Sequence, residues 1–182
     1  MSGLREYIFK IVILGDGKVG KTSLVLQYTE HKFNENYIMS IGANFAIKMV
    51  HVKDNTIIRL QLWDLAGQQH FQFVRPSFYR GAFASIFVFD LTRRDSFNSI
   101  REWKKECDQY VPGVPLVLVG NKSDLNDERV VSRREGQALS LEIGSDYYYE
   151  TSAKTANNIE KLFLDITDTL IEKHITRRNL GL

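Results

Sequence analysis

The sequence predicts an α/β protein built on a six-stranded, mostly parallel sheet with helices on both faces. Short apolar runs rich in β-branched and aromatic residues alternate along the chain with segments of helical spacing, and such runs are typical of strands that are buried on both faces. A helix that crosses between two strands makes them parallel and covers one face of the sheet. The runs that we expect to be parallel strands are residues 7–14, 57–64, 83–90, 116–120 and 147–150.

One further strand is expected to run antiparallel to the others. Residues 43–54 carry the alternating apolar side chains Phe45, Ile47 and Met49, and a turn at Asp54-Asn55 leads directly into the strand at residues 57–64. Two strands that are joined by so short a turn form a hairpin. We therefore place this segment beside residues 57–64 in the reversed direction.

Three helical patterns support the alternation. One begins after Ser96 and carries Cys107 on an apolar face, so we interpret this cysteine as a buried structural thiol. A second begins at a capping box formed by Ser132 and Glu135, and a third lies near the C-terminus. The apolar positions are Phe97, Ile100, Trp103 and Tyr110 in the first pattern, and Ile159, Leu162, Phe163, Ile166 and Leu170 in the last.

Composition and charge exclude several classes of protein. The 182 residues carry a formal net charge of +2, too small a surplus for a nucleic-acid-binding surface. No apolar run approaches the roughly 18 residues that a membrane span needs, and the N-terminus lacks a signal peptide. A single cysteine allows no internal disulfide, which fits a reducing compartment. We expect one cytoplasmic domain over residues 1–182, with its core at about 7–175 and a short polar C-terminal tail.

The first strand runs directly into the motif G-x-x-x-x-G-K-[ST], which predicts a phosphate-binding loop. Glycines allow the backbone to wrap closely around phosphates, with its N–H groups pointing inward at the start of a helix. Lys21 would reach the β- and γ-phosphates, and the Thr22 hydroxyl would bind Mg²⁺. The residues that we expect to hold the phosphates are Gly15, Asp16, Gly17, Lys18, Val19, Gly20, Lys21, Thr22 and Ser23.

The choice between GTP and ATP depends on Asn121, Lys122 and Asp124, which follow the strand at residues 116–120. A carboxylate accepts two hydrogen bonds side by side, and guanine offers a matching N1–H and 2-amino pair. Adenine has an acceptor at N1 and no 2-amino group, so it would leave Asp124 facing a lone pair, and unpaired buried polar groups are costly. The motif therefore predicts a guanine nucleotide.

A third motif, from Trp63 to Gln68, ends the strand at residues 57–64. Asp64 is placed to hold Mg²⁺, through water, opposite the phosphate loop. The N–H of Gly67 could meet the γ-phosphate, and Gln68 could orient the water that attacks it. We predict Gln68 and Lys21 as the catalytic residues, Mg²⁺ as the cofactor, and GTP and GDP as substrate and product.

Together these motifs resemble the Ras superfamily of small GTPases, and within it the Rab family most, over about residues 7–175. The Rab-like segments are residues 41–45, 60–68, 79–82 and 87–92. The resemblance implies the P-loop small-GTPase fold, slow GTP hydrolysis and a Rab-like role in membrane traffic. It also implies two switch loops, at about residues 33–45 and 64–79, that bind effectors, exchange factors and GTPase-activating proteins.

The resemblance assigns further residues to the base. Residues 150–154 resemble the loop with which the family contacts guanine, so Ser152, Ala153 and Lys154 are implied there, with the Ala153 N–H directed at the base carbonyl. Lys122 would pack over the base, and Phe33 matches the family's aromatic residue at the guanine edge.

Other positions relate to the phosphates and the metal. Tyr37 would close over the phosphates, and Ser40 stands where the family has a Mg²⁺-contacting threonine. The metal ligands implied are therefore Thr22, Ser40 and Asp64. The C-terminal residues 174–182 contain no cysteine that could be prenylated. Either a tail is missing from this chain or this relative carries no lipid, and peripheral membrane association is expected only in the first case.

Two other functions remain open. A pseudo-GTPase would bind GTP as a scaffold without turnover, which an intact Gln68 and Thr22 disfavour. A P-loop kinase or ATPase is disfavoured by Asp124. Arg75 and Arg80 lie near the second switch, and we interpret both as structural or partner-facing residues rather than as arginine fingers. Turnover without an activating protein would therefore be slow.

Overall fold

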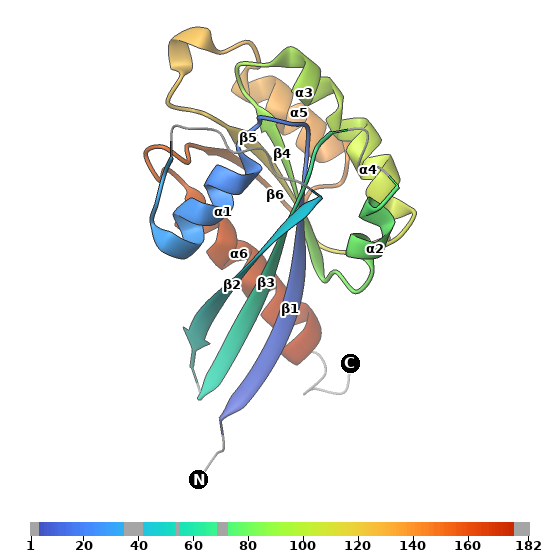
Figure 1. Cartoon of the computed structure of the whole chain (residues 1–182), viewed down its shortest axis with the longest axis vertical. Coiled ribbons are helices and arrows are strands. Elements are labelled where there is room, and N and C mark those ends of the chain that lie inside the picture. Colours follow the sequence, from blue (N-terminus) through green and yellow to red (C-terminus); the bar gives the residue numbers. More distant parts are fainter. Residues whose placement is uncertain (1–3, 35–41, 54, 69–72, 177–182) are drawn as a thin grey trace.

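The computed structural model describes residues 4–34, 42–53, 55–68 and 73–176. These residues form a six-stranded sheet in the order β2-β3-β1-β4-β5-β6 (Figure 1). β2 pairs antiparallel with β3, and the other neighbouring strands are parallel, which confirms the predicted fold class. The predicted strand ends lie within two residues of those observed: β1 is Arg5–Leu14, β2 Ala43–Val52, β3 Thr56–Leu65, β4 Ala84–Asp90, β5 Leu116–Asn121 and β6 Tyr147–Thr151.

Helices cover both faces of the sheet, and the face that each covers follows from the alternation of side chains along the strands. In β1, Ile11 and Ile13 belong to the core shared with α1 and α6, whereas Val12 and Leu14 belong to the core shared with the other helices. Where both faces are buried, as in β4 and in residues 11–14 of β1, the strand is almost continuously apolar. The helices are α1 (Lys21–Glu30), α2 (Arg75–Tyr79), α3 (Arg94–Asn98), α4 (Ile100–Asp108), α5 (Arg133–Glu142) and α6 (Ile159–Ile171), with a 3₁₀ turn at Asn126–Glu128 and a π-helical turn at Glu172–Thr176.

The helix predicted to begin after Ser96 begins earlier, at Arg94, and is divided into α3 and α4 at Ser99. Ser96 is buried, and its hydroxyl accepts a hydrogen bond of 3.0 Å from the Asp90 N–H. This bond ties the first turn of the helix to the end of β4, so Ser96 lies inside the helix rather than before it. Cys107 is buried as predicted, whereas Tyr110 lies beyond the end of α4 and is exposed.

The two remaining helix predictions agree with the structure. At the start of α5, the Ser132 hydroxyl accepts a hydrogen bond from the Glu135 N–H, and the Glu135 carboxylate accepts one from the Ser132 N–H, which completes the capping box. The five apolar residues predicted for the last helix are all buried on α6. Across the described ranges, no helix combines the length and the apolar character that a membrane span requires.

The parallel strands bring the predicted motifs to one edge of the sheet. β1, β3, β4, β5 and β6 point in the same direction, so their carboxyl ends lie together. In open α/β sheets, ligands bind beyond these ends. The segments that follow the ends are residues 15–20 after β1, 66–68 after β3, 91–93 after β4, 122–124 after β5 and 152–154 after β6.

Candidate functional site

The loop between β1 and α1 depends on glycine at two positions. Gly15 and Gly20 have φ angles of 139° and 96°, in the region that L-residues rarely adopt. A Cβ atom on Gly15 would lie 2.1 Å from the carbonyl oxygen of Val88, and one on Gly20 would lie 2.3 Å from Nδ2 of Asn121. The glycines therefore let the loop pack directly against β4 and β5.

Lys21, the first residue of α1, lies back across this loop. Its Nζ donates hydrogen bonds of 2.9 Å to the carbonyl oxygens of Gly15 and Asp16, and the side chain is 6% exposed. Burial lowers the pKa of the ammonium group; the carboxylates of Asp64 and Asp16 oppose this shift, and the guanidinium of Arg75 adds to it. The Lys21 ammonium group is thus held inside the loop by the carbonyl oxygens of Gly15 and Asp16, and phosphate oxygens could replace these two acceptors.

Thr22 and Asp64 bring two oxygen ligands together from separate elements. The Thr22 hydroxyl on α1 donates a hydrogen bond of 2.5 Å to Oδ2 of Asp64 on β3, and Asp64 is 1% exposed. Mg²⁺ binds oxygen ligands and usually keeps several waters, so this hydroxyl–carboxylate pair fits it. Ser40, the third predicted ligand, and Tyr37 lie outside the described residues.

Two contacts that the sequence analysis did not predict support the loop from outside. Nε1–H of Trp103 on α4 donates a hydrogen bond of 2.8 Å to the Asp16 carboxylate, and the Arg93 guanidinium donates one of 2.8 Å to the Gly17 carbonyl. Asp16 and Gly17 were predicted as phosphate-binding residues. The Asp16 side chain points instead to Trp103, so what it contributes within the loop is its backbone.

A cavity of about 470 Å³ lies where the predicted base-binding residues meet. The sequence analysis had not singled out Asn34 and Leu125, and it had predicted the other lining residues. The lining is Lys18, Gly20, Ser23, Phe33, Asn34, Asn121, Lys122, Asp124, Leu125, Ala153 and Lys154.

Hydrogen bonds connect the predicted guanine-binding residues, Asn121 and Asp124, to the phosphate loop and to the end of β6. Asn121 donates through Nδ2 to the Val19 carbonyl over 3.0 Å and accepts through Oδ1 from the Thr151 hydroxyl over 3.0 Å. The Ser152 hydroxyl donates a hydrogen bond of 2.6 Å to the Asp124 carboxylate. Ser152 is itself fully buried, and its hydroxyl fixes the position of the Asp124 carboxylate.

Lys122 has a partner that the sequence analysis missed. Its Nζ lies 2.6 Å from Oδ2 of Asp90, which is fully buried at the end of β4. The other carboxylate oxygen of Asp90 accepts hydrogen bonds from the N–H and the hydroxyl of Thr92. Asp90 could have been found from its place in the Rab-like segment 87–92, directly after a predicted strand.

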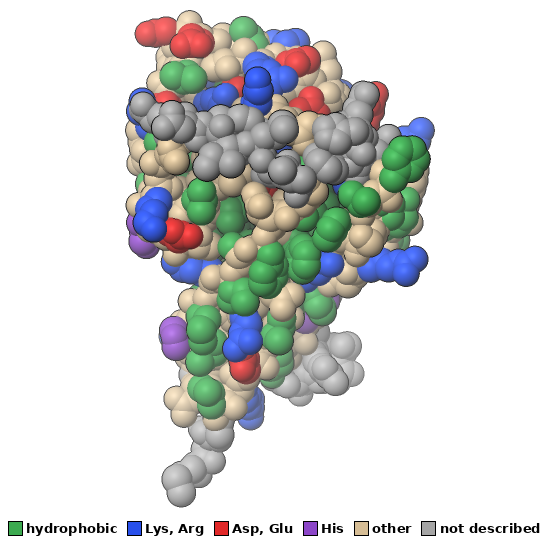
Figure 2. Space-filling view, in the orientation of Figure 1, with side chains coloured by type: hydrophobic (Ala, Val, Ile, Leu, Met, Phe, Trp, Pro, Cys, Tyr) green, Lys and Arg blue, Asp and Glu red, His purple; other side chains and the backbone are tan. Residues whose placement is uncertain are grey.

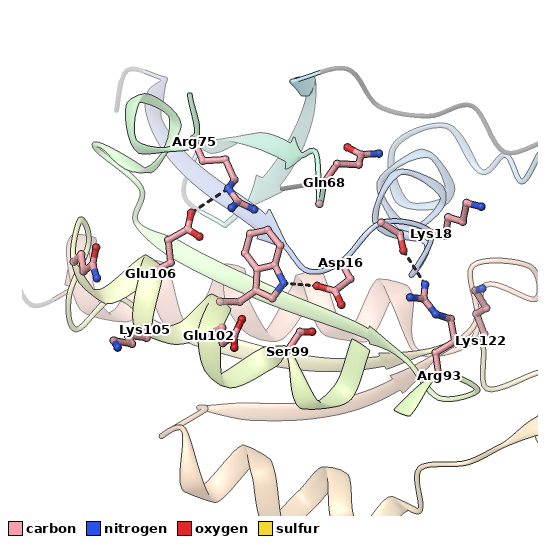
Figure 3. A pocket seen from close by; sticks show the side chains of 14 residues that line it. Asp16, Lys18, Gln68, Arg75, Arg93, Ser99, Glu102, Lys105, Glu106 and Lys122 are labelled. Atoms are coloured by element: carbon pink, nitrogen blue, oxygen red, sulfur yellow. Dashed lines mark hydrogen bonds and ion pairs between the residues drawn. The ribbon is translucent and has the colours of Figure 1, made fainter. Parts of the chain in front are cut away.

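A second cavity, of about 1030 Å³, adjoins the first, because Lys18 and Lys122 line both. Gly67 and Gln68 line it beside the phosphate loop, and it extends between α2 and α4 (Figure 3). A Cβ atom on Gly67 would lie 2.4 Å from the Gly15 carbonyl oxygen, so the end of the third motif touches the loop. Among the described residues, Oε1 of Gln68 is buried and has no hydrogen-bond partner. It is an acceptor that a water molecule could use.

The two arginines near the second switch differ. Arg75 lines the second cavity and is 5% exposed; its Nε lies 3.1 Å from Oε1 of Glu106, and its guanidinium carbon lies 4.3 Å from the centre of the Trp103 ring. Arg80 is exposed, and its carbonyl accepts a hydrogen bond from Lys10. Arg75 is therefore a buried residue of the site's wall.

Comparison with known proteins agrees with this arrangement. The sequence matches the Ras family over residues 10–172. It is 45% identical over 160 residues to "Ras-related protein RIC1" of Oryza sativa subsp. japonica, covering 87% of this chain and 78% of that protein. It is also 39% identical over 180 residues to "Ras-related protein RABD1" (98% and 87% covered) and 40% identical over 169 residues to "Ras-related protein RABD2a" (92% and 82% covered), both of Arabidopsis thaliana. The chain therefore belongs to the Ras family and is a Rab-like small GTPase.

Proposed function

We propose that this GTPase is a molecular switch that binds GTP with Mg²⁺, hydrolyses it slowly, and rearranges its two switch loops when the γ-phosphate leaves. The adjoining cavities are the observation that supports this most. Asp124 and Ala153 line one of them, and Gly17 and Gln68 line the other. A guanine base in the first cavity would have its phosphates at the loop that leads to the second.

The phosphates would be held by charge and by backbone amides. Lys21 would exchange its two carbonyl acceptors for oxygens of the β- and γ-phosphates, and the N–H groups of residues 15–20 would surround the diphosphate. Thr22 and Asp64 would hold Mg²⁺, together with Ser40. Mg²⁺ supplies neutralisation of the negative charge on the phosphate oxygens.

The base would be read by hydrogen bonds. Asp124, fixed by the Ser152 hydroxyl, would accept from N1–H and the 2-amino group of guanine. The Ala153 N–H would donate to the base carbonyl. Lys122, anchored on Asp90, would cover one face of the ring, with Phe33 at its edge and Lys154 nearby. Adenine would leave the Asp124 carboxylate unpaired, which is why the site would select guanine.

Hydrolysis would proceed by in-line attack of water on the γ-phosphate. The buried Oε1 of Gln68 would accept a hydrogen bond from that water and orient it, while Lys21 and the loop amides stabilise the charge on the γ-phosphate. An arginine supplied by a GTPase-activating protein adds about 10³–10⁵-fold in related reactions. Without one, turnover would be slow.

Partners would bind beside the switch loops. On the edge strand β2, Phe45, Ile47 and Met49 are about half exposed. The ring of Trp63 on β3 joins Phe45 to Phe78 on α2, with centroid distances of 4.9 Å and 5.6 Å. Figure 2 shows apolar side chains gathered in a band on this face. A contiguous exposed apolar patch marks an interaction surface, and we propose that effectors, exchange factors and activating proteins bind it.

We extend the proposal to the regulation of membrane traffic, because the chain is Rab-like and resembles RABD1 and RABD2a over most of its length. The biochemical part of the proposal is tested by phosphate release, measured with GTP and with ATP side by side in the presence of Mg²⁺. Slow release from GTP alone is expected. GTP binding without release would favour a pseudo-GTPase scaffold, and release from ATP would favour a P-loop kinase or ATPase.

A further inference from the structure

Arg75 is a buried cation in the wall of the cavity that also contains Gly17, Gly67 and Gln68. It stands at the start of α2, seven residues after Gln68, which ends the third motif. A buried charge is costly unless it has a partner of opposite sign. The way in which this guanidinium is compensated therefore determines the electrostatic potential on this side of the phosphate site.

Glu106 is that partner. Its Oε1 lies 3.1 Å from Nε of Arg75, and the same oxygen accepts a hydrogen bond of 2.8 Å from the Tyr79 hydroxyl. Glu106 is 19% exposed and so remains accessible to solvent at one side. Figure 3 shows the Arg75 guanidinium directed toward the Glu106 carboxylate. The positive charge of Arg75 is balanced by one carboxylate that lies farther along the cavity.

Trp103 fixes the distance between this ion pair and the phosphate loop. Its ring lies under the guanidinium at 4.3 Å, and its indole N–H is bonded to the Asp16 carboxylate in the loop. One aromatic side chain therefore contacts both Arg75 and the loop. Arg75 also lines the same cavity as the loop residues Asp16, Gly17 and Lys18. Its charge therefore acts across this cavity on the phosphate site.

We propose that Arg75 is an additional cation of the γ-phosphate site, and that Glu106 sets how much of its positive charge the γ-phosphate experiences. The inference rests on the proposed function. Arg75 would act through space, as a residue that tunes the potential rather than one that contacts the substrate. GTP carries a negatively charged γ-phosphate that GDP lacks, so the positive potential of Arg75 should favour binding of GTP over GDP. The same potential should stabilise negative charge that develops on the phosphate oxygens during hydrolysis.

The two partners should have opposite effects when neutralised. Glu106→Gln removes the compensating charge, keeps an oxygen for the Tyr79 hydroxyl, and should raise the ratio of GTP to GDP affinity about three- to tenfold. Arg75→Gln leaves the Glu106 carboxylate uncompensated and should lower that ratio by a similar factor. Arg75→Lys keeps the charge and should restore most of the ratio. The double variant should return close to the unmodified protein.

The experiment measures dissociation constants for GDP and for a non-hydrolysable GTP analogue, with Mg²⁺, for each of these variants. Glu102→Gln is the matched control, because Glu102 is an exposed carboxylate on the same helix, lines the same cavity and, within the part of the chain that the structure describes, forms no ion pair with Arg75. Shifts of opposite sign support the inference. A purely structural role would shift the affinity ratio in the same direction in Glu106→Gln and Arg75→Gln, and that result would overturn the inference. Changes in the ratio no larger than the change in Glu102→Gln would overturn it as well.

Two further outcomes are decisive. If thermal unfolding shows that Arg75→Gln does not fold, Glu106→Gln alone decides: a raised ratio relative to Glu102→Gln supports the inference, and an unchanged ratio overturns it. If the unmodified protein binds neither GDP nor the GTP analogue, the proposed function fails together with this inference. If the protein binds GDP tightly but no variant changes the ratio of GTP-analogue to GDP affinity, this inference fails and the proposed function stands.

Discussion

The indole N–H of Trp103 donates a hydrogen bond of 2.8 Å to the carboxylate of Asp16, which joins helix α4 to the phosphate loop. Trp103→Phe would keep most of the ring and remove the donor. We expect it to lower the free energy of unfolding by about 1–3 kcal/mol, because a partly buried carboxylate would lose a hydrogen bond. Urea unfolding at a fixed GDP concentration measures this, since bound nucleotide also stabilises the fold.

Trp63→Phe is the matched control for that experiment. Nε1 of Trp63 has no hydrogen-bond partner among the described residues, so the same substitution there removes ring area and no bond. An equal loss of stability in the two variants would show that the bond between Trp103 and Asp16 contributes nothing measurable.

Gly67 packs against the phosphate loop so closely that a side chain would collide with it. A Cβ atom would lie 2.4 Å from the Gly15 carbonyl oxygen and 2.5 Å from the Gly17 nitrogen. We expect Gly67→Ala to displace the start of the second switch, at a cost of about 1–3 kcal/mol. Single-turnover hydrolysis should slow at least about fivefold, with GDP affinity changed less, because the base contacts remain. Hydrolysis at the unmodified rate would mean that the close approach is not needed.

Gln68 is expected to act on the attacking water and not on bound nucleotide. Gln68→Leu removes the buried Oε1 acceptor and should lower the single-turnover rate of hydrolysis about tenfold or more while GTP affinity stays nearly constant. Gln109→Leu is a suitable control, since Gln109 lines the same cavity but is exposed. Undiminished hydrolysis in the Gln68 variant would remove this residue from the mechanism.

Cys107 gives stability a dependence on alkaline pH. Burial raises the pKa of its thiol from 9.0 to about 12, and the nearby Asp108 carboxylate adds to the shift. Because the folded state holds this proton more tightly than the unfolded state, the stabilisation is complete below pH 9 and is lost as the pH rises from about 9 toward about 12. Between about pH 8 and 10, the unfolding free energy of the unmodified protein should therefore fall by about 1–1.5 kcal/mol more than that of Cys107→Ala. Parallel falls in urea titrations would contradict this.

The sequence allowed much of the fold to be predicted, because its signals are local. A strand segment buried on both faces is mostly apolar, and the apolar runs within β1 and β4 placed these strands within two residues of their observed ends. The turn at Asn55, with φ of 53°, joins the predicted antiparallel pair. The start of α3 was misplaced because the Ser96 hydroxyl, which resembles a helix cap in sequence, is bonded to Asp90 in the adjoining strand.

The residues of the candidate site also fall into two groups: those that a local motif predicts and those that only tertiary packing brings to the site. Lys21, Asp64 and Asp124 belong to motifs of fixed spacing, so their neighbourhood could be predicted from one segment each. Trp103 and Arg93 could not, because their contacts with the phosphate loop join residues 87 and 76 positions apart. Helical periodicity predicted Trp103 as a core residue, which its ring is; only tertiary packing determines where its N–H points.

The central claim, that this site binds a guanine base through Asp124, is tested most directly by Asp124→Asn. The asparagine keeps an oxygen for the Ser152 hydroxyl and presents an amide donor where the carboxylate accepted, and xanthine has a carbonyl where guanine has its 2-amino group. Dissociation constants for GDP and xanthosine diphosphate should be compared with those of Asp127→Asn, which alters an exposed carboxylate three residues away. We predict that GDP binding weakens about ten- to a hundredfold and that xanthosine diphosphate binding strengthens, in the Asp124 variant alone. Unchanged GDP affinity in that variant would contradict the account.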